Sequence, residues 1–312
     1  MQYRQLGRSG PQVSVLCLGT MTFGRECDEA ESRRILDAAL DGGINFLDTA
    51  DIYASGRSEE ILGRLLQGRR ERVVVASKVR GRMGPGPEDE GLSPRHIRLA
   101  IEATLRRLQT DYVDLYYAHW PDEAVPLEET LAALNELVRE GKVRAIGLSN
   151  YEAPQIRAAL HIARERSLAP VIALQPHYHL LERRAEGEVL PVCLEEGLGV
   201  ASYAPLGGGF LTGKYTSTAA PAGTRLAGDE TRATRYLTEG RLTAVQEFTR
   251  VAAGAGLPPS HVAIGWVLGH SALTSAIIGA RTAGQLAALL DAGDRQLAEG
   301  LRQEVGAVLE GR

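Results

Sequence analysis

The sequence predicts an α/β fold, a single (β/α)8 TIM barrel over residues 1–312, and three observations favour it. Short apolar runs of strand length alternate with helical patterns along nearly the whole chain, which is typical of βαβ units and a parallel sheet. Eight such runs are present, and no linker rich in Pro, Gly and Ser divides them. The first run lacks the G-x-G-x-x-G turn that the main alternative, a doubly wound dinucleotide-binding fold, would need. Length alone leaves one or two domains open.

The expected strands are mostly continuous apolar runs, as befits strands covered on both faces. They span residues 15–18, 45–47, 73–78, 113–119, 143–148, 171–175, 199–203 and 276–278. Helix-end signals lie between them. Asp28 and Glu31 resemble a capping box, Gly42 begins a Gly-Gly stop, and Ser93 with Pro94 predicts the N-cap and first residue of a later helix.

Two connections are longer than the two to six residues usual in such folds: 80–92 and about 206–239. Both follow strands, so in a barrel both lie at the C-terminal face, where these folds carry their sites.

Composition favours a globular protein with a small-molecule partner. The net charge of −4, with 44% hydrophobic and 24% charged residues, gives no overall field that would recruit nucleic acid or an anionic membrane. The apolar runs are far shorter than the roughly 20 residues of a membrane span, and the N-terminus has no apolar stretch of signal-peptide length. We therefore expect a cytoplasmic protein whose three cysteines are reduced.

Four ionisable residues lie at or just past successive strand ends: Asp48, Tyr53, Lys78 and His119. Strand ends converge on one mouth of a barrel, so these side chains can meet around one reacting atom. A buried Lys beside a Tyr would lower the phenol pKa from near 10 toward neutrality and make the Tyr a usable proton donor, while a carboxylate would keep the Lys charged.

Each of the four also has a structural interpretation. Asp48 could cap the following turn, Lys78 could extend from a strand end into solvent, Tyr53 could be a loop aromatic, and His119 could be a satisfied histidine beside Trp120. Their shared location at strand ends favours the joint site.

The segment 43–53, Gly-Ile-Asn-Phe-Leu-Asp-Thr-Ala-Asp-Ile-Tyr, followed by Ser-Glu-Glu-Ile-Leu-Gly at 58–63, resembles the aldo-keto reductase signature. Residues 108–119, 147–150, 175, 203–206, 211–215 and 278–282 follow that family's order, so the resemblance spans nearly the whole chain. It implies a barrel that binds a nicotinamide dinucleotide without a Rossmann domain and transfers hydride to a carbonyl. Tyr53 would be the general acid, Lys78 would depress its pKa, Asp48 would pair with Lys78, and His119 would orient the carbonyl.

The resemblance also implies a set of cofactor contacts. Ser149, Asn150 and Gln175 would hold the carboxamide, and Tyr203 would stack on the nicotinamide. The remaining contacts line the channel: Gly19, Thr20 and Met21 at its floor, Pro205, Leu206, Gly209, Leu211 and Lys214 over the pyrophosphate, and Gly279, Ala280, Arg281 and Gln285 near the adenosine. Arg281 favours NADPH over NADH because a guanidinium suits the 2′-phosphate. Gly279 departs from the family, in which many members have Lys, and this leaves the cofactor preference open.

Two other motifs are weaker. Residues 208–214 fit G-x-x-x-x-G-K, but Tyr215 stands where a P-loop needs Ser or Thr. His177 and His179 could face a metal together, yet nothing nearby completes a ligand set, so we expect no metal site.

The prediction is a reductase of an aldehyde or ketone that acts with NADPH. The alternative is a cofactor-binding redox sensor, since some members of the family are channel-associated regulatory subunits. Phe23 and Trp120 are expected to line the substrate pocket, and the chain is expected to be a monomer or a weak homo-oligomer.

Overall fold

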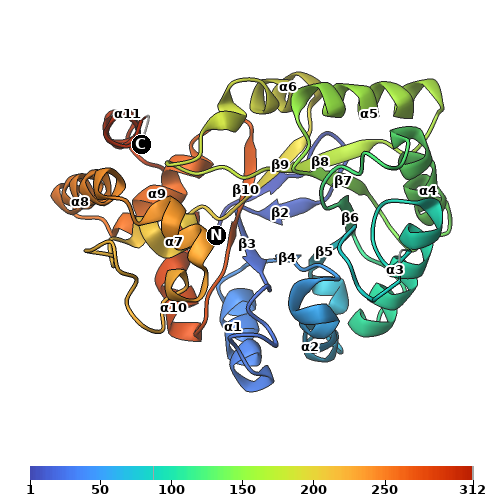
Figure 1. Ribbon diagram of the computed structural model, residues 1–312, viewed down its shortest axis with the longest axis horizontal. Coiled ribbons are helices and arrows are strands. Elements are labelled where there is room, and N and C mark those ends of the chain that lie inside the picture. Colours follow the sequence, from blue (N-terminus) through green and yellow to red (C-terminus); the bar gives the residue numbers. More distant parts are fainter. Residues whose placement is uncertain (87, 311–312) are drawn as a thin grey trace.

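The computed structural model describes residues 1–86 and 88–310 and confirms the TIM barrel. Eight parallel strands close in the order β10-β3-β4-β5-β6-β7-β8-β9, and helices surround them (Figure 1). The barrel strands are β3 (Leu16–Gly19), β4 (Phe46–Asp48), β5 (Val74–Val79), β6 (Leu115–Ala118), β7 (Ile146–Ser149), β8 (Val171–Gln175), β9 (Gly199–Tyr203) and β10 (Leu273–Ile278).

All eight expected strands are present, and the differences lie at their ends. The ranges 171–175 and 199–203 coincide with β8 and β9. In contrast, β10 already begins at Leu273, and β6 begins only at Leu115, because Val113 makes just an isolated bridge with Val143. The buried character of the strands is as expected, since every residue of β5 and β6 is buried.

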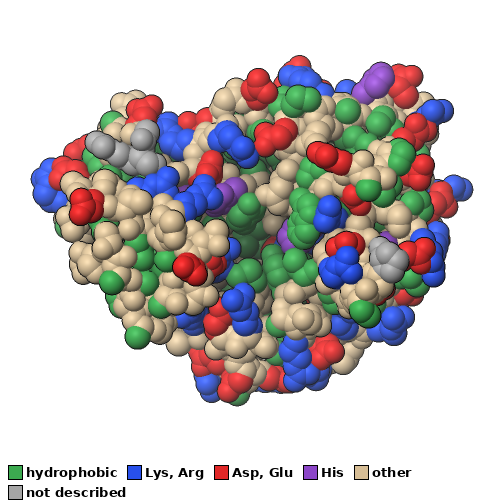
Figure 2. All heavy atoms as spheres, in the orientation of Figure 1, with side chains coloured by type: hydrophobic (Ala, Val, Ile, Leu, Met, Phe, Trp, Pro, Cys, Tyr) green, Lys and Arg blue, Asp and Glu red, His purple; other side chains and the backbone are tan. Residues whose placement is uncertain are grey.

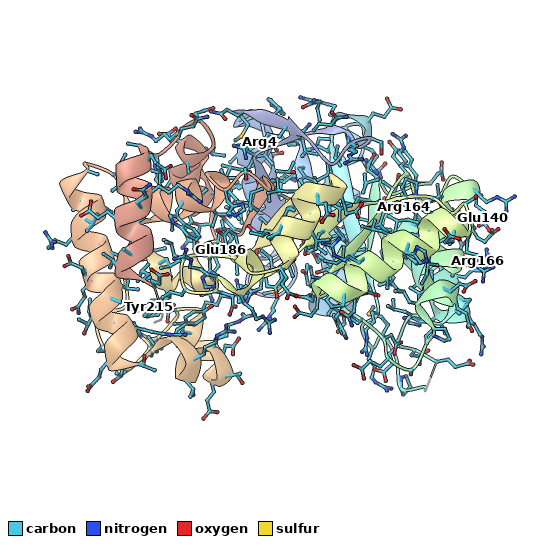
Figure 3. The ribbon with its side chains drawn as sticks, turned by 90° about the horizontal axis from the view of Figure 1, so that it is seen from above. Arg4, Glu140, Arg164, Arg166, Glu186 and Tyr215 are labelled. Carbon is cyan, nitrogen blue, oxygen red and sulfur yellow. The ribbon has the colours of Figure 1, made fainter. Side chains whose placement is uncertain are left out.

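An antiparallel hairpin that the sequence analysis did not predict precedes the barrel. It consists of β1 (Tyr3–Gln5) and β2 (Gln12–Ser14). Leu6 and Val13 are fully buried against the barrel interior, and a side chain at Gly7 would collide with the Ile172 carbonyl at the start of β8. The hairpin therefore plugs the N-terminal end of the barrel. Figure 3 shows Arg4 at that end, where its guanidinium donates to the carbonyls of Leu268 and Leu273.

The helices of the outer layer begin with α1 (Glu29–Asp41), α2 (Arg57–Leu65), α3 (Pro94–Leu108), α4 (Leu127–Arg139), α5 (Ala153–Glu165) and α6 (Val189–Glu196). They continue with α7 (Glu230–Tyr236), α8 (Glu239–Gly254), α9 (Pro259–Leu268), α10 (Ala283–Leu290) and α11 (Glu299–Val308). Asp28 and Ser93 are N-caps, as expected. The Glu31 side chain does not complete a capping box, because it accepts from the Ala283 backbone and so ties α1 to α10.

The two long connections lie on the C-terminal face. Residue 87 of the 80–92 connection lies outside the described residues. The 206–239 connection is not structureless: it contains the 3-10 turns η4 (Gly207–Thr212) and η5 (Leu226–Gly228) and helix α7. Over residues 1–86 and 88–310, no single helix is long and apolar enough to cross a membrane; only the sharply bent pair α8 and α9 passes by length and composition.

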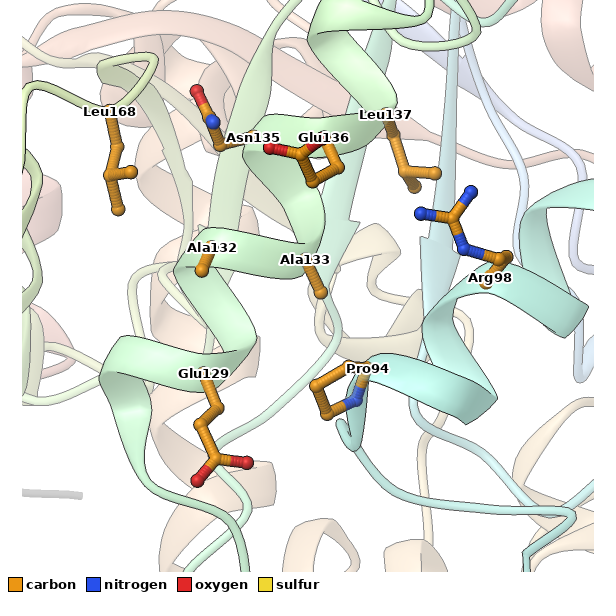
Figure 4. Close-up of a pocket in the computed structure, with 9 residues that line it drawn as sticks. All are labelled: Pro94, Arg98, Glu129, Ala132, Ala133, Asn135, Glu136, Leu137 and Leu168. Carbon is orange, nitrogen blue, oxygen red and sulfur yellow. The ribbon is translucent and has the colours of Figure 1, made fainter.

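A groove of about 330 Å³ lies on the outer wall of the barrel, away from the strand ends. Figure 4 shows that α3 and α4 form its sides, with Leu168 at one edge. The ionisable side chains that line it are Arg98, Glu129 and Glu136. The titratable residues of the predicted site lie elsewhere, at the mouth of the barrel.

Candidate active site

Tyr53 is placed by an unusual turn after β4. The turn η1 (Tyr53–Gly56) has positive φ at Ala54 (49°), Ser55 (54°) and Gly56 (89°). L side chains rarely adopt this region, and such strain concentrates at functional sites. Gly56 is required for a second reason, because a Cβ there would lie 2.8 Å from Cδ of Arg107. The turn therefore packs closely against Arg107 and holds Tyr53 at the mouth of the barrel.

Lys78 joins three groups of the predicted site. Its Nζ donates to Asp48 Oδ1 at 2.6 Å, to the Thr49 carbonyl at 2.8 Å and to the Tyr53 hydroxyl at 3.1 Å. The ammonium has three donors, so this set uses all of them. Lys78 is fully buried, and Asp48 is 2% exposed. The structural interpretation of Lys78 as a chain extending into solvent is therefore wrong.

His119 directly follows the last residue of β6, and its ring lies near Tyr53. Its ring centroid is 6.2 Å from that of Tyr53, in an edge-on arrangement, and its backbone N–H donates to the Val79 carbonyl. Its Nδ1 is buried and has no hydrogen-bond partner within the described residues. Burial and the charge of Lys78 lower the pKa of His119 to about 2, so the imidazole is neutral and can share a proton rather than carry a charge.

The pKa of Tyr53 differs in direction from the sequence-based expectation. Burial raises it above the usual value near 10, and the nearby Lys78 offsets only part of this rise because Asp48 opposes it. For Lys78 itself, burial lowers the pKa, but Asp48 and Tyr53 outweigh burial and the net pKa is raised. At neutral pH the cluster therefore holds a charged ammonium and a protonated phenol, which is the form that can donate a proton.

The predicted carboxamide-binding residues form a network at the ends of β6 to β9. Asn150 donates to the His119 carbonyl at 2.9 Å and accepts from the Tyr203 hydroxyl at 2.8 Å, while Ser149 donates to the Gln175 carbonyl. Gln175 Nε2 donates to Asp48 Oδ2 at 2.7 Å. Gln175 thus connects the amide network to the Lys78 cluster across the barrel, a link the sequence analysis did not anticipate.

Tyr203 has one face covered by protein. The His177 ring stacks on it at 4.8 Å with an interplanar angle of 4°. His177 Nε2 lies 3.1 Å from Nε2 of His179, whose Nε2 is also 3.0 Å from the Tyr236 hydroxyl. Burial lowers the pKa of His177 to about 4, so this ring is neutral at pH 7. The stacking on Tyr203 and the hydrogen bonds to His179 and Tyr236 explain the positions of both histidine rings.

The other residues predicted to contact the cofactor differ in how exposed their side chains are. Gly279 and Gln285 are exposed and Arg281 is half-buried on the β10 side, and Lys214 is exposed at the end of the 206–214 segment. The Arg281 guanidinium donates to the Gly223 carbonyl at 2.7 Å, which joins the 206–239 connection to the end of β10. Met21, Leu206 and Gly209 are half-buried. The side chains of Thr20, Pro205, Leu211 and Ala280 are buried, and Gly19 is half-buried against Ile277.

The two expected substrate residues are placed very differently. Phe23 is fully buried in the core between barrel and helices, so its side chain offers no surface to a substrate here. Trp120 is half-buried beside His119, with ring centroids 4.6 Å apart. Figure 2 shows a central hollow on this face, with hydrophobic and histidine side chains inside it and side chains of both charges around it.

The donor set fits a nicotinamide dinucleotide. The Ser149 hydroxyl and the Asn150 amide can exchange their present hydrogen bonds for bonds to a carboxamide. The Gln175 amide, which donates to Asp48, lies at the end of β8 next to them, and Tyr203 provides an aromatic platform. Arg281, after β10, and Lys214, after β9, are cations that could pair with the phosphates of the dinucleotide. Within the described residues, no group of three His, Cys, Asp or Glu side chains is placed to hold a metal ion.

A second buried cluster lies beneath the Tyr53 turn. Glu59 is fully buried and accepts from Arg107 Nε at 2.7 Å and from Ser77 Oγ at 2.5 Å. Asp51 is also fully buried, but its Oδ1 only accepts from the Ile52 N–H, and Oδ2 has no partner among the described residues. Asp51 and Glu59 belong to the two segments that resemble the aldo-keto reductase signature, and the sequence predicted no role for either. The sequence feature that could have indicated a buried site is the presence of two carboxyl groups shortly after a fully buried strand, β4.

Asp51 predicts a pH-dependent stability difference. Burial and the adjacent Glu59 raise the pKa of Asp51 from 3.8 to about 8. The native state therefore holds a proton that the unfolded state releases between about pH 4 and pH 8, and folding becomes less favourable as pH rises through that window. Asp51→Asn removes this contribution. We expect the unfolding free energy of the variant, relative to wild type, to increase by about 1–4 kcal/mol from pH 5 to pH 8 in urea titrations. Parallel pH profiles of the two proteins would contradict the raised pKa.

The eight-stranded barrel, with Tyr, Lys and Asp joined by hydrogen bonds and a His beside them at its C-terminal mouth, is a TIM barrel with titratable residues where such barrels carry their active sites. Comparison with known proteins gives the family. Residues 15–308 match the model of the Aldo/keto reductase family, and the chain belongs to that family, which implies oxidoreductase activity.

Among the relatives, one is named as an oxidoreductase and another as a probable potassium channel subunit. "Uncharacterized oxidoreductase YrpG" of Bacillus subtilis is 42% identical over 92% of this chain and 89% of its own length. "Protein tas" of Escherichia coli is 36% identical over 99% and 97%. A protein of Oryza sativa subsp. japonica named "Probable voltage-gated potassium channel subunit beta" is 39% identical over 92% and 89%.

Proposed function

We propose that this protein reduces an aldehyde or ketone to an alcohol with NADPH, and that Tyr53 donates the proton. The observation that carries the proposal is the buried contact of Lys78 Nζ with both Asp48 and the Tyr53 hydroxyl, next to a neutral His119. The reduced nicotinamide supplies the hydride when it is bound.

The chain's own residues would do the rest. Tyr53 and His119 present hydrogen-bond donors to the carbonyl oxygen, where negative charge develops during reduction. Lys78 stabilises the phenolate that remains after proton donation, and Asp48 with Gln175 keeps Lys78 charged and fixed in place. Burial of Lys78, Asp48 and Gln175 excludes water from the ion pair and strengthens its interactions.

A cofactor-binding sensor is the second candidate, because two plant relatives and one fission-yeast relative carry names of potassium channel β subunits. The two are separated by following NADPH absorbance with an aromatic aldehyde while cofactor binding is measured by fluorescence quenching. Consumption of NADPH supports the reductase. Binding without consumption over a panel of aromatic, aliphatic and sugar aldehydes supports the sensor. In either case we propose a cytoplasmic protein, monomeric or weakly associated.

Preference for NADPH over NADH is expected to depend on Arg281. Its side chain faces the exposed edge of the β10–α10 connection and retains N–H donors beyond the one given to Gly223. Because a charge-assisted contact contributes about 1.5–3 kcal/mol, Arg281→Ala should raise the KM for NADPH about 10- to 100-fold and that for NADH much less. Arg281→Lys, which keeps the charge without the planar fork, should fall between. Equal effects on both cofactors would assign Arg281 only to loop anchoring through Gly223.

A further inference from the structure

Arg80 is a strained residue at the mouth of the barrel that the mechanism above does not use. It follows the last residue of β5 and stands two positions after Lys78. Its φ is 142°, a region that L residues rarely adopt, and its carbonyl accepts from the Gly91 N–H at 2.9 Å. Such backbone strain persists only where the surrounding structure requires it, and it concentrates at functional sites.

The Arg80 guanidinium has few partners for its degree of burial. It lies over the Trp120 ring, 5.0 Å from the centroid, and the side chain is only 25% exposed. The nearest carboxylate oxygen is Oδ1 of Asp122 at 3.9 Å, beyond hydrogen-bond distance. Asp122 instead accepts from the backbone N–H groups of Leu92 and Ala124.

Two other arginines with little exposed surface, Arg70 and Arg107, donate to carboxylates at hydrogen-bond distance, whereas Arg80 does not, although Nε of Arg70 is also buried without a partner in the described part of the chain. Arg107 donates to Glu59 at 2.7 Å, and Arg70 donates to Asp114 at 2.7 Å and to two carbonyls. Within the described residues Arg80 makes no side-chain hydrogen bond, and its Nε is buried without a partner. Because a guanidinium has five donors, leaving them unmet in a largely buried place costs free energy unless a ligand accepts them.

Arg80 belongs to the same mouth as the reacting groups. Trp120, on which it stacks, directly follows His119, and the two rings are 4.6 Å apart. The His119 N–H donates to the Val79 carbonyl, so the ends of β5 and β6 are held side by side at this point. A group bound by Arg80 would therefore belong to a substrate whose carbonyl reaches Tyr53 and His119.

We propose that Arg80, supported by Trp120, binds a carboxylate of the substrate, so that the preferred substrates are aldehydes or ketones that also carry a carboxylate. The planar guanidinium can donate two parallel hydrogen bonds to the two oxygens of a carboxylate. Asp122 at 3.9 Å offsets part of the positive charge, which favours a singly charged carboxylate over a doubly charged phosphate. Trp120 adds an apolar wall for an aromatic or short aliphatic body. The carbonyl part of this inference rests on the proposed function.

The competing explanation is structural: Arg80 could anchor the 80–92 connection through Asp122. The test is a comparison of 4-carboxybenzaldehyde with its methyl ester, which removes the charge and leaves the ring and the aldehyde. We expect wild type to favour the acid, and Arg80→Met to lower the acid-to-ester ratio of kcat/KM about 10- to 100-fold. Arg80→Lys should recover part of the ratio.

Arg82→Met is the matched control. Arg82 lies in the same connection, is 50% exposed and pairs with Glu90, so its loss perturbs the connection without touching the mouth. It should leave the acid-to-ester ratio unchanged. If Arg80→Met lowers kcat/KM equally for acid and ester, Arg80 is an anchor and the carboxylate site is wrong.

A binding measurement separates this inference from the proposed function. The chain has two Trp residues, and Trp266 is buried, so intrinsic fluorescence can report on Trp120. Benzoate should give a saturable change whose Kd rises about tenfold in Arg80→Met, and benzamide should not. An Arg80-dependent benzoate response without turnover of either aldehyde would contradict the reductase and retain the carboxylate site. Turnover of both aldehydes with no dependence on Arg80 in either assay would overturn the carboxylate site alone.

Discussion

Tyr53→Phe is expected to reduce aldehyde turnover by about 10²- to 10⁴-fold while NADPH binding is retained. The variant removes the hydroxyl that Lys78 contacts at 3.1 Å and keeps the ring that packs edge-on against His119. Lys78 loses one of three acceptors and keeps Asp48 and Thr49, so the fold should tolerate the change. The measurement is kcat by NADPH absorbance together with the cofactor Kd by fluorescence quenching.

Tyr116→Phe provides the matched control for that experiment. Tyr116 lies on β6, is fully buried, and its hydroxyl has no hydrogen-bond partner in the described part of the chain. The same loss of one oxygen from a buried Tyr should therefore leave kcat near the wild-type value. Turnover by Tyr53→Phe at the level of Tyr116→Phe would assign the proton to another donor, with His119 as the next group to test.

The sequence was sufficient to predict the barrel and to predict that Asp48, Tyr53, Lys78 and His119 lie close together. Continuous apolar runs mark strands buried on both faces, and parallel strands in a barrel all end at one mouth, so residues at strand ends must converge. This argument places Asp48 and Lys78 correctly without any distance. It could not find the hairpin β1–β2, because its three-residue strands, Tyr-Arg-Gln and Gln-Val-Ser, contain no run of apolar residues.

The errors in the site come from burial, which a linear pattern does not measure. Phe23 was expected to line the substrate pocket, but its side chain is fully buried in the core. The sequence-based expectation for Tyr53 counted the attraction of Lys78 and omitted desolvation, which is the larger influence on its pKa. The sequence suggested no role for Arg80, because an Arg at the start of a Gly-rich connection is usually solvated and the sequence does not show how few partners its guanidinium has.

Lys78→Met is expected to lower stability as well as abolish turnover. The substitution leaves the Asp48 carboxylate, which is 2% exposed, with only the Gln175 amide and no positive charge. Breaking a buried ion pair from one side costs about 3–5 kcal/mol, because the remaining charge stays desolvated. Urea unfolding of wild type and variant measures the loss. Arg250→Met, which breaks the exposed pair with Glu247, should cost less than about 1 kcal/mol in the same assay.

The double variant Lys78→Met with Asp48→Asn distinguishes stability from chemistry. Asn keeps the shape of Asp48 and an oxygen for Gln175, and it carries no charge that needs a partner. The double variant should therefore regain at least about 2 kcal/mol over Lys78→Met alone, since contacting residues are not additive. Turnover should stay absent in both, because neither supplies a cation next to the Tyr53 hydroxyl. If restored stability brought back turnover, the ion pair would serve only to hold the fold, and the positive charge beside Tyr53 would have no part in the proton transfer.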